Sequence, residues 1–492
     1  MTTVLDGAKP YFRFFEEISA IPRESGDEAR VTDHLVAFAQ ERGLRHVRDE
    51  TGNLVVFKPA TPGYESVEPV ILQAHTDMVC LARDGVEHDF GTDPIDLVVG
   101  DDGWLRARGT SLGADDGCGV AAILYVLDRE GLRHPALECV FTVEEEVGML
   151  GAARLDYSLL SARRMVGLDA KDENECLVAS AGGRRFTLTR QSAPERATGT
   201  AVEIVVDGLV GGHPGVEIHK GGANAVRVLG RVLDGIRRAG ADFRIAEIHG
   251  GDKGNAIPGS CRAVVMVDAS AAAAVVALAE AAGAAQVSQR SFTDPAMTVA
   301  VRTIDGERDV LGGEATAALC DALLLLPNGV LQMSPVFADA VQTSSNVAAL
   351  HVEDGLSTII LSARGSVEAQ LDDVSADIER VAAMTGFDAE AGAAYPGMPF
   401  MPHSPFRDLY DAVMTEQWGS GIDMLAAHAG IELGYFAQRM PGIETVALGP
   451  FITGAHTFDE AVQVASFERI CLLLAAFLER LADAPAPTPT SL

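Results

Sequence analysis

The residues of this chain best suited to chemistry are acids and histidines that directly follow apolar segments. The three adjacent acids Glu144–Glu146 follow the mostly apolar run 137–143, which predicts a buried strand of a parallel sheet. His75 ends a second such run, Asp169 follows a third, and Asp115 opens a helical segment. Catalytic groups in parallel sheets lie at the carboxyl ends of the strands, so we expect these side chains to converge.

A second histidine completes this set. His456 lies in the turn 449–457, just before the last helical segment of the chain. Two imidazoles and three carboxylates suit two zinc-class ions, and a further carboxylate would remain as a general base. Each residue alone also has a structural explanation, such as a solvated acidic turn for Glu144–Glu146 or a helix cap for Asp115. The combination favours a dinuclear metal site.

Asp77 follows His75 by two residues. In an extended segment, residues i and i+2 point to the same side. Asp77 can therefore accept a hydrogen bond from the ring nitrogen of His75 that does not bind metal, which would fix the tautomer of the ring. The alternative is a solvent-facing Asp in a turn.

The elements that would position these residues can be read from hydrophobic spacing. Helices are expected over 8–20, 27–43 and from 113 onward, and strands over 53–57, 69–74 and 164–168. Segment 84–104, rich in Asp and Gly, is expected to form an exposed excursion. A last helix over 458–484 precedes a Pro-rich tail, 485–492.

The pattern changes after about residue 183. Strands are expected over 201–206, 261–267, 297–302 and 357–361, with helices over 223–238 and 271–285 between them. The Pro-rich segment 396–405 indicates a linker. We therefore predict an α/β protein with a discontinuous catalytic domain, whose mostly parallel central sheet is flanked by helices, and an inserted α/β lid domain. The expected boundaries are 1–183 and 397–492 for the catalytic domain and 184–396 for the lid.

Composition excludes several classes of protein. The chain has 492 residues, too many for one ordinary core, and its formal net charge of −32 argues against binding to nucleic acid or to an anionic membrane. Its seven cysteines are scattered and form no C-x-x-C pair, as is typical of reduced thiols. We find neither a signal-peptide pattern in the first ten residues nor a membrane-spanning apolar run, so a cytoplasmic location is expected.

Five segments together resemble the metal-binding motifs of the M20 metallopeptidases. More closely, they are similar to the aminoacyl-histidine dipeptidases, also called Xaa-His dipeptidase, peptidase D or beta-alanyl-histidine dipeptidase. The likeness follows the order of the chain and covers nearly all of it. The segments are His75–Val79, Gly113–Gly117, Glu145–Met149, Leu168–Asp169 and Gly454–His456.

The resemblance assigns a role to each residue of the cluster. It implies that His75 and Asp169 hold one ion and that His456 and Glu146 hold the other. Asp115 would bridge the two ions. It also implies that Glu145 is the general base and that Asp77 orients His75, whereas Glu144 has no family role.

The resemblance also implies substrate contacts outside the metal cluster. In the Gly-rich turn 208–215, His213 would reach the substrate carbonyl oxygen, with His219 as the competing candidate. Asn255 and Arg364 match lid positions that contact substrate, and an Arg can hold a free carboxylate in bidentate fashion. Gly434 matches a position near the substrate in the catalytic domain.

These assignments predict a cytosolic dipeptidase that acts on dipeptides with a free C-terminus, and the expected substrates are Xaa-His (carnosine-like) dipeptides. A water bridging the two ions would attack the scissile carbonyl, with Glu145 taking its proton. The expected ions are Zn²⁺, with Mn²⁺ or Co²⁺ as alternatives. The expected partners are a small dipeptide and a second copy of the chain, because the family commonly forms dimers. The rivals are an N-acyl-amino-acid deacylase or broad aminopeptidase on the same site, and a non-catalytic binding protein.

Overall fold

The computed structural model describes residues 4–481, which form two compact units. Within the described residues, unit 1 contains 4–179, Met398–Ala426 and 431–481. Unit 2 contains Ser180–Gly397 and the short segment Ala427–Gly430. The predicted Pro-rich tail, 485–492, lies outside the described residues.

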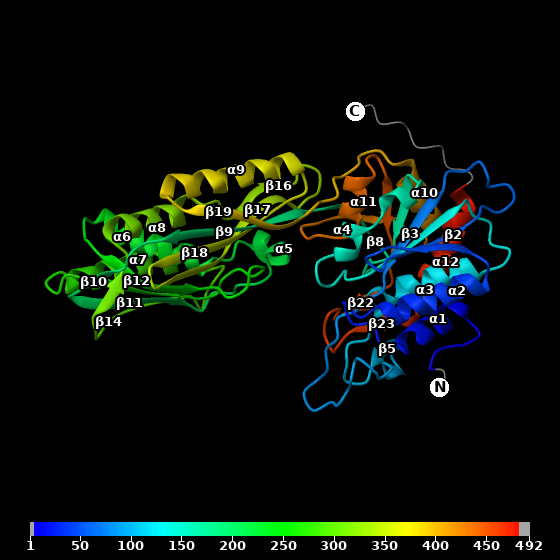
Figure 1. Ribbon diagram of the computed structural model, residues 1–492, viewed down its shortest axis with the longest axis horizontal. Helices are drawn as coiled ribbons and strands as arrows, with labels where there is room; N and C mark the ends of the chain where they lie inside the picture. The colour runs from blue at the N-terminus through cyan, green and yellow to red at the C-terminus, as the bar shows by residue number, and fades with distance from the viewer. Residues whose placement is uncertain (1–3, 482–492) are drawn as a thin grey trace. The chain divides into compact units, whose positions relative to one another are not determined.

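A six-stranded sheet forms the centre of unit 1, and its middle strands are parallel (Figure 1). Two of the six strands pair antiparallel at one edge. Because β3 (Val70–His75) and β6 (Leu137–Thr142) are mostly apolar and are buried along their whole length, they can lie inside the sheet. The strand order is β1 (Arg45–Arg48), β2 (Leu54–Lys58), β6 (Leu137–Thr142), β3 (Val70–His75), β7 (Arg164–Gly167), β21 (Glu444–Ala447).

Helices α1 (Pro10–Ser19), α2 (Ala29–Glu41) and α3 (Ala114–Asp128) gather on one side of this sheet (Figure 1). The apolar residues of α1 recur at helical spacing and are buried, and Phe14 packs edge-on against Phe38 of α2. Helix α3 is buried along almost its whole length, because it lies between the sheet and α1. The sheet and these helices therefore form a single layered core.

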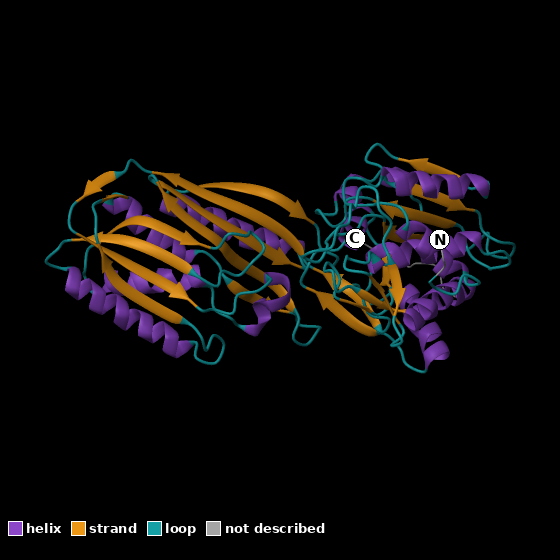
Figure 2. Cartoon of the chain, turned by 90° about the horizontal axis from the view of Figure 1, so that it is seen from below, coloured by secondary structure: helices purple, strands orange, loops and turns teal. Residues whose placement is uncertain are grey.

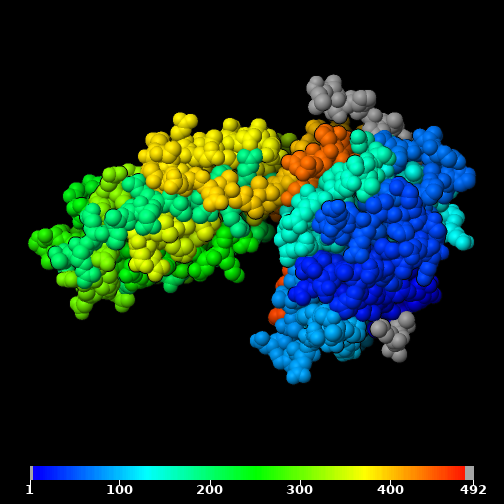
Figure 3. All heavy atoms as spheres, viewed as in Figure 1, coloured from blue at the N-terminus to red at the C-terminus, as the bar shows by residue number. Residues whose placement is uncertain are grey.

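The last segment of the chain completes unit 1. Strand β21 pairs in parallel with β7, and α11 (Leu433–Arg439) packs against α4 (Leu150–Arg154). Figure 3 shows the orange C-terminal segment seated against cyan residues of the first segment. The same unit contains α10 (Pro405–Trp418) and α12 (Val464–Arg480).

The parallel strands place their carboxyl ends along one edge. His75 at the end of β3 lies opposite Thr142 at the end of β6, and Gln73 lies opposite Gly167 at the end of β7. The segments that follow these three strands therefore begin at the same edge, and they carry the candidate site. The predicted α/β fold class is confirmed.

Unit 2 is built on a nine-stranded sheet with helices packed on it (Figure 2). The pairings in this sheet are antiparallel among the described residues. Its main helices are α6 (Ala225–Arg238), α7 (Ala272–Gln289), α8 (Gly313–Leu325) and α9 (Glu368–Thr385). The strands are β9 (Gly182–Gln191), β11 (Thr200–Asp207), β12 (Arg244–Gly250), β13 (Cys261–Val267), β14 (Thr298–Ile304), β16 (Gly329–Met333), β17 (Val341–Glu353), β18 (Leu356–Gly365) and β19 (Asp388–Tyr395).

Two local predictions differ from the structure. The segment 84–104 is only partly an excursion, because β4 (Leu97–Val99) and β5 (Trp104–Ala107) join a four-stranded sheet with β22 (Ile452–Thr453) and β23 (Ala461–Gln463). The helix predicted from residue 458 begins at Val464 instead, because the preceding residues pair with β5 as β23. The predicted end of that helix, 482–484, lies outside the described residues.

Candidate metal centre

The carboxylate of Asp115 lies between two histidines in unit 1. Its Oδ1 is 3.1 Å from Nε2 of His75, and its Oδ2 is 3.0 Å from Nε2 of His456. Asp115 is 3% exposed and stands in the first turn of α3. The carboxylate of Glu460 accepts hydrogen bonds from the backbone N–H groups of Leu112, Gly113 and Asp115. Asp115 therefore presents one oxygen to each histidine from a fixed backbone.

Each histidine also faces a second carboxylate. Nε2 of His75 lies 3.8 Å from Oδ1 of Asp169, and Nε2 of His456 lies 2.9 Å from Oε2 of Glu146. Two groups of donors thus share Asp115, one with His75 and Asp169 and the other with His456 and Glu146. This arrangement is suited to two ions with a bridging carboxylate.

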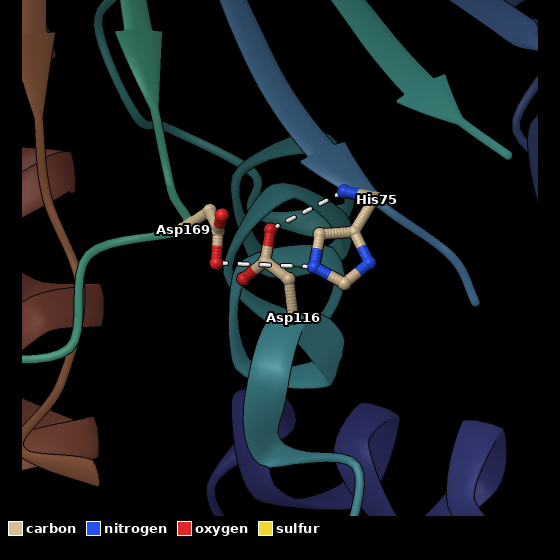
Figure 4. A group of neighbouring side chains, drawn as sticks. All are labelled: His75, Asp116 and Asp169. Carbon is tan, nitrogen blue, oxygen red and sulfur yellow. Dashed lines mark hydrogen bonds and ion pairs between the residues drawn. The ribbon is translucent and has the colours of Figure 1, made fainter. Parts of the chain in front are cut away.

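Asp116 is a further acid at this site that the sequence analysis did not single out. It accepts a hydrogen bond from the backbone N–H of His75 at 3.3 Å (Figure 4). Its second oxygen accepts from the backbone N–H of Gly119. Asp116 could also join His75 and Asp169 as a metal ligand. Its bonds to two backbone N–H groups give it a structural role in holding the end of β3 against α3.

Asp77 connects His75 to the acidic turn. Its Oδ1 lies 3.4 Å from Nδ1 of His75, the ring nitrogen that faces away from Asp115. The same carboxylate accepts from the backbone N–H groups of Glu145 and Glu146 at 3.0 and 3.1 Å, and from Ser25. Burial raises the pKa of Asp77, but the contact with His75 and these hydrogen bonds outweigh it and lower the pKa to about 2.

The three acids of the turn face different surroundings. Glu146 contacts His456, whereas Glu145 lies in a group with His75 and Glu146. Burial and the negative charges of neighbouring acids raise the pKa of Glu145. Glu144 adopts a positive φ of 52°, and its backbone N–H donates to Glu28. The turn therefore separates three neighbours that the sequence presents as equivalent.

A lysine also contacts this cluster. Nζ of Lys171 lies 2.7 Å from Oδ1 of Asp115 and also pairs with Asp169. Burial lowers the pKa of Lys171, but the two carboxylates outweigh it and hold the pKa well above its usual value. The short spacing from Asp169 to Lys171 is the only signal in the sequence for this contact.

A further buried carboxylate, that of Glu432, lies between the two central strands. Glu432 accepts hydrogen bonds from Gln73 of β3 and Thr142 of β6, each at 2.7 Å. Burial raises the pKa of Glu432 to about 8. Glu432 joins the strand that ends at His75 to the strand that precedes Glu145, and the sequence analysis missed it. Gly434, two residues later, is buried at the start of α11 in the same unit.

Arg23 supports the backbone around the cluster. It is 2% exposed, and its guanidinium donates to the carbonyl oxygens of Thr76, Asp77 and Gly113. Gly113 has a φ of +70°, and a Cβ on it would lie 2.4 Å from the Arg23 guanidinium, so a glycine is required there. Arg23 therefore holds the segment after β3 against the start of α3.

We expect Arg23→Met to destabilise the fold by about 3 kcal/mol, because three buried backbone carbonyls lose their donor. The free energy of unfolding in urea measures this effect. Arg13→Met is the matched control, since Arg13 makes solvent-exposed ion pairs and should cost less than about 1 kcal/mol. Equal losses for the two variants would contradict the role given to Arg23.

The donor set of the cluster fits divalent metal ions. Oε1 of Glu146 is buried and has no hydrogen-bond partner among the described residues, so it is available as a ligand. Contacts with Asp115 and Glu146 raise the pKa of His456 to about 10, since the surrounding carboxylates favour positive charge. Imidazole nitrogens and carboxylate oxygens are ligands of zinc and related ions. His75, Asp115 and Asp169 would hold one ion, and Asp115, Glu146 and His456 the other.

The other predicted site residues belong to unit 2. His213 precedes the short helix α5 (Pro214–Glu217), and its Nδ1 accepts from the backbone N–H of Gly215 at 3.2 Å. Arg364 lies on β18 and is 8% exposed. Asn255 is exposed in the loop between β12 and β13. His219, the competitor of His213, is exposed in the 3₁₀ turn after α5.

Comparison with known proteins identifies the family. The model of Peptidase family M20/M25/M40 matches residues 71–480, which include every residue of the cluster. The chain belongs to this family. It is therefore a peptidase, and the resemblance seen in its motifs is confirmed.

Two relatives of this M20 peptidase match it over nearly its whole length. It is 32% identical over 477 residues to the cytosol non-specific dipeptidase of Escherichia coli, covering 96% of this chain and 98% of the relative. The solved structure of an aminoacylhistidine dipeptidase from Vibrio alginolyticus superimposes with a TM-score of 0.89 at 30% identity, covering 97% of each chain. An aminopeptidase from Bacillus cereus, at 18% identity and a TM-score of 0.55, shares the fold.

Within residues 4–481, this M20 peptidase has no helix that is both long and apolar enough to cross a membrane.

Proposed function

We propose that this M20 peptidase is a metal-dependent dipeptidase that hydrolyses dipeptides with a free C-terminus, Xaa-His dipeptides among them. The observation that carries the proposal is the Asp115 carboxylate, shared between two histidine–carboxylate groups with Glu145 beside them. The Escherichia coli and Vibrio relatives support the substrate class, since the names of both say that they are dipeptidases.

The residues of the cluster would hold two divalent ions, Zn²⁺ in the first instance and Mn²⁺ or Co²⁺ as alternatives. When bound, such ions lower the pKa of water and polarise a carbonyl group. Asp77 orients the ring of His75, because its carboxylate lies against Nδ1 and leaves Nε2 facing Asp115 and Asp169.

Glu145 acts as the general base. Its carboxylate takes a proton from the attacking water as the water's oxygen bonds to the scissile carbonyl carbon. Glu145 then gives that proton to the leaving amine when the C–N bond breaks. Because Asp77 holds the backbone N–H of Glu145, the turn is fixed while the carboxylate exchanges its proton.

His213 donates a hydrogen bond to the carbonyl oxygen as negative charge develops on it. Its Nδ1 already accepts from Gly215, which leaves the proton of the neutral ring on Nε2. Burial and the charge of Arg364 lower the pKa of His213, so the ring is neutral near pH 7 and offers this one donor. His219 makes no such contact with its own turn among the described residues.

Arg364 binds the free carboxylate of the dipeptide. We expect Arg364→Met to raise KM for a dipeptide by roughly 10- to 100-fold, with a small change in kcat, because the substrate carboxylate loses one charge-assisted hydrogen-bonding partner. The matching dipeptide amide, which lacks the carboxylate, should respond much less. Arg196→Met is the control, because Arg196 pairs only with exposed acids on the surface of unit 2. An equal loss on the acid and the amide would contradict the assignment.

A substrate panel with metal analysis tests the whole proposal. It compares Xaa-His dipeptides, other dipeptides and N-acyl amino acids on protein of measured metal content. Hydrolysis of many different dipeptides would resemble the non-specific dipeptidase of Escherichia coli. A preference for Xaa-His dipeptides would resemble the aminoacylhistidine dipeptidase of Vibrio alginolyticus. Hydrolysis of N-acyl amino acids only, or protein that binds no metal, would refute the proposal. A cytoplasmic location and a homodimer are further parts of it, and fractionation and light scattering would test them.

A further inference from the structure

Four residues of the C-terminal segment belong to unit 2. The chain leaves unit 1 after Ala426, contributes Ala427–Gly430 to unit 2 and returns at Ile431. The carbonyl of Ala427 accepts from the backbone N–H of Ala181, just before β9. This excursion carries one buried histidine, His428, which is 8% exposed.

His428 is tied to β17 and β18 at both its ring and its backbone. Its Nε2 shares a hydrogen bond with Oγ of Ser344 at 2.7 Å. Its carbonyl oxygen accepts from Nη1 of Arg364 at 3.3 Å. Ser344 and Arg364 are direct partners in the antiparallel ladder of β17 and β18, so their side chains lie on the same face of the sheet. His428 therefore contacts both members of this cross-strand pair, Ser344 through its ring and Arg364 through its carbonyl oxygen.

The guanidinium of Arg364 is buried, yet no carboxylate lies within ion-pair distance of it among residues 4–481. Its Nε has no hydrogen-bond partner in the described residues. Burial and the charge of Arg364 lower the pKa of His428 to about 4, so His428 contributes no charge of its own near neutral pH. The guanidinium of Arg364 is therefore held by the neutral carbonyl group of His428, and no protein carboxylate within residues 4–481 occupies it.

The turn of His213 approaches the same point. A Cβ on Gly215 would lie 2.7 Å from the carbonyl oxygen of His428, 2.9 Å from the ring of His213 and 3.1 Å from the guanidinium of Arg364. Gly215 therefore lets this turn lie directly against both residues. His428 contacts Arg364 and closely neighbours the element that orients His213.

We propose that His428 is a positioning residue, which fixes the guanidinium of Arg364 for the carboxylate of the substrate by anchoring its own ring on Ser344. This inference rests on the proposed function, because it takes Arg364 as the group that binds the carboxylate. Without the ring, the carbonyl of residue 428 is no longer held over Arg364, and the guanidinium gains rotamers that do not face the substrate.

The test compares His428→Ala and Ser344→Ala with the parent enzyme on a dipeptide and on its amide. We expect His428→Ala to raise KM for the dipeptide by about 10-fold, with kcat within about 2-fold and little change on the amide. Ser344→Ala should give a smaller rise of the same kind, and Ser344→Thr, which keeps the hydroxyl, should restore the parent value. His249→Ala, at an exposed histidine of the same unit, is the control.

A double-mutant cycle shows whether His428 acts through Arg364. In the Arg364→Met background, His428→Ala should produce no further rise in KM. Full additivity of the two effects, or an equal loss on dipeptide and amide, would overturn the inference. If His428→Ala does not fold, Ser344→Ala and Ser344→Thr decide the question alone, because both leave His428 in place.

The outcome separates this inference from the proposed function. A parent enzyme that does not hydrolyse dipeptides refutes the function. An active parent whose KM rises in Arg364→Met but not in His428→Ala or Ser344→Ala retains the function and refutes the positioning role.

Discussion

Glu145→Gln is expected to lower kcat for dipeptide hydrolysis by about three orders of magnitude, while the metal content stays at the parent level. Gln keeps the size of the side chain and can still accept hydrogen bonds, but it cannot take a proton from water. The backbone N–H of residue 145 still donates to Asp77, so the turn keeps its shape. Metal analysis and steady-state kinetics on the same preparation measure both quantities.

The neighbouring acid provides a matched control for this experiment. Glu144 belongs to the same turn, but its backbone N–H donates to Glu28, and it is not among the groups of donors that could hold a metal ion in the described chain. We expect Glu144→Gln to keep kcat within about 3-fold of the parent value, as is usual for a substitution away from the reacting atoms. Full activity in Glu145→Gln, or equal losses in both variants, would refute the assignment of the base.

Asp115→Asn is expected to lower the binding of both ions, because its carboxylate is shared by the two donor groups. The amide of Asn keeps one oxygen and replaces the other by a hydrogen-bond donor that cannot bind a metal ion. Asp169→Asn removes a carboxylate from the His75 group alone, so it should release about one ion per chain and spare the second. Elemental analysis after dialysis distinguishes the two variants.

Activity provides a second measure of the same prediction. Both variants should lose at least about 100-fold in kcat/KM, and added metal should rescue Asp169→Asn more readily than Asp115→Asn. Asp102→Asn is the control, because Asp102 pairs with Arg106 on the exposed surface. The bridging position of Asp115 would be contradicted if Asp115→Asn retained both ions, or if Asp169→Asn lost both ions to the same extent.

The convergence of the cluster could be predicted because it depends on strand ends. His75 ends a strand, and Glu145 and Asp169 follow two others; the apolar runs of these strands are visible in the sequence, and parallel strands end together. Asp115 was predicted at a helix start and lies there. The structure brings these side chains together in unit 1, and their individual roles stay predictions for the variants above to test.

Contacts that depend on side chains far apart in the chain could not be predicted. Glu432 lies 290 residues from Thr142, whose hydroxyl donates a hydrogen bond to it, and His428 lies 84 residues from its partner Ser344. Neither residue belongs to a periodic pattern or ends an apolar run. Lys171 resembles any surface lysine in the sequence, and only the fold turns it toward Asp115. The four-residue excursion to unit 2 was missed for the same reason, because it is too short to change the local pattern.

The sequence by itself determined the residue types of the site, the strands that end at it and the family to which the chain belongs. These properties are local, since each depends on a short run of residues and its period. The tertiary structure decided how the three acids of the turn divide their contacts and which oxygen of Asp115 faces which histidine. It also decided that the buried Glu432 joins the strands next to the site. Such details depend on backbone conformation, as at Glu144, and on hydrogen bonds between distant segments, which no local pattern encodes.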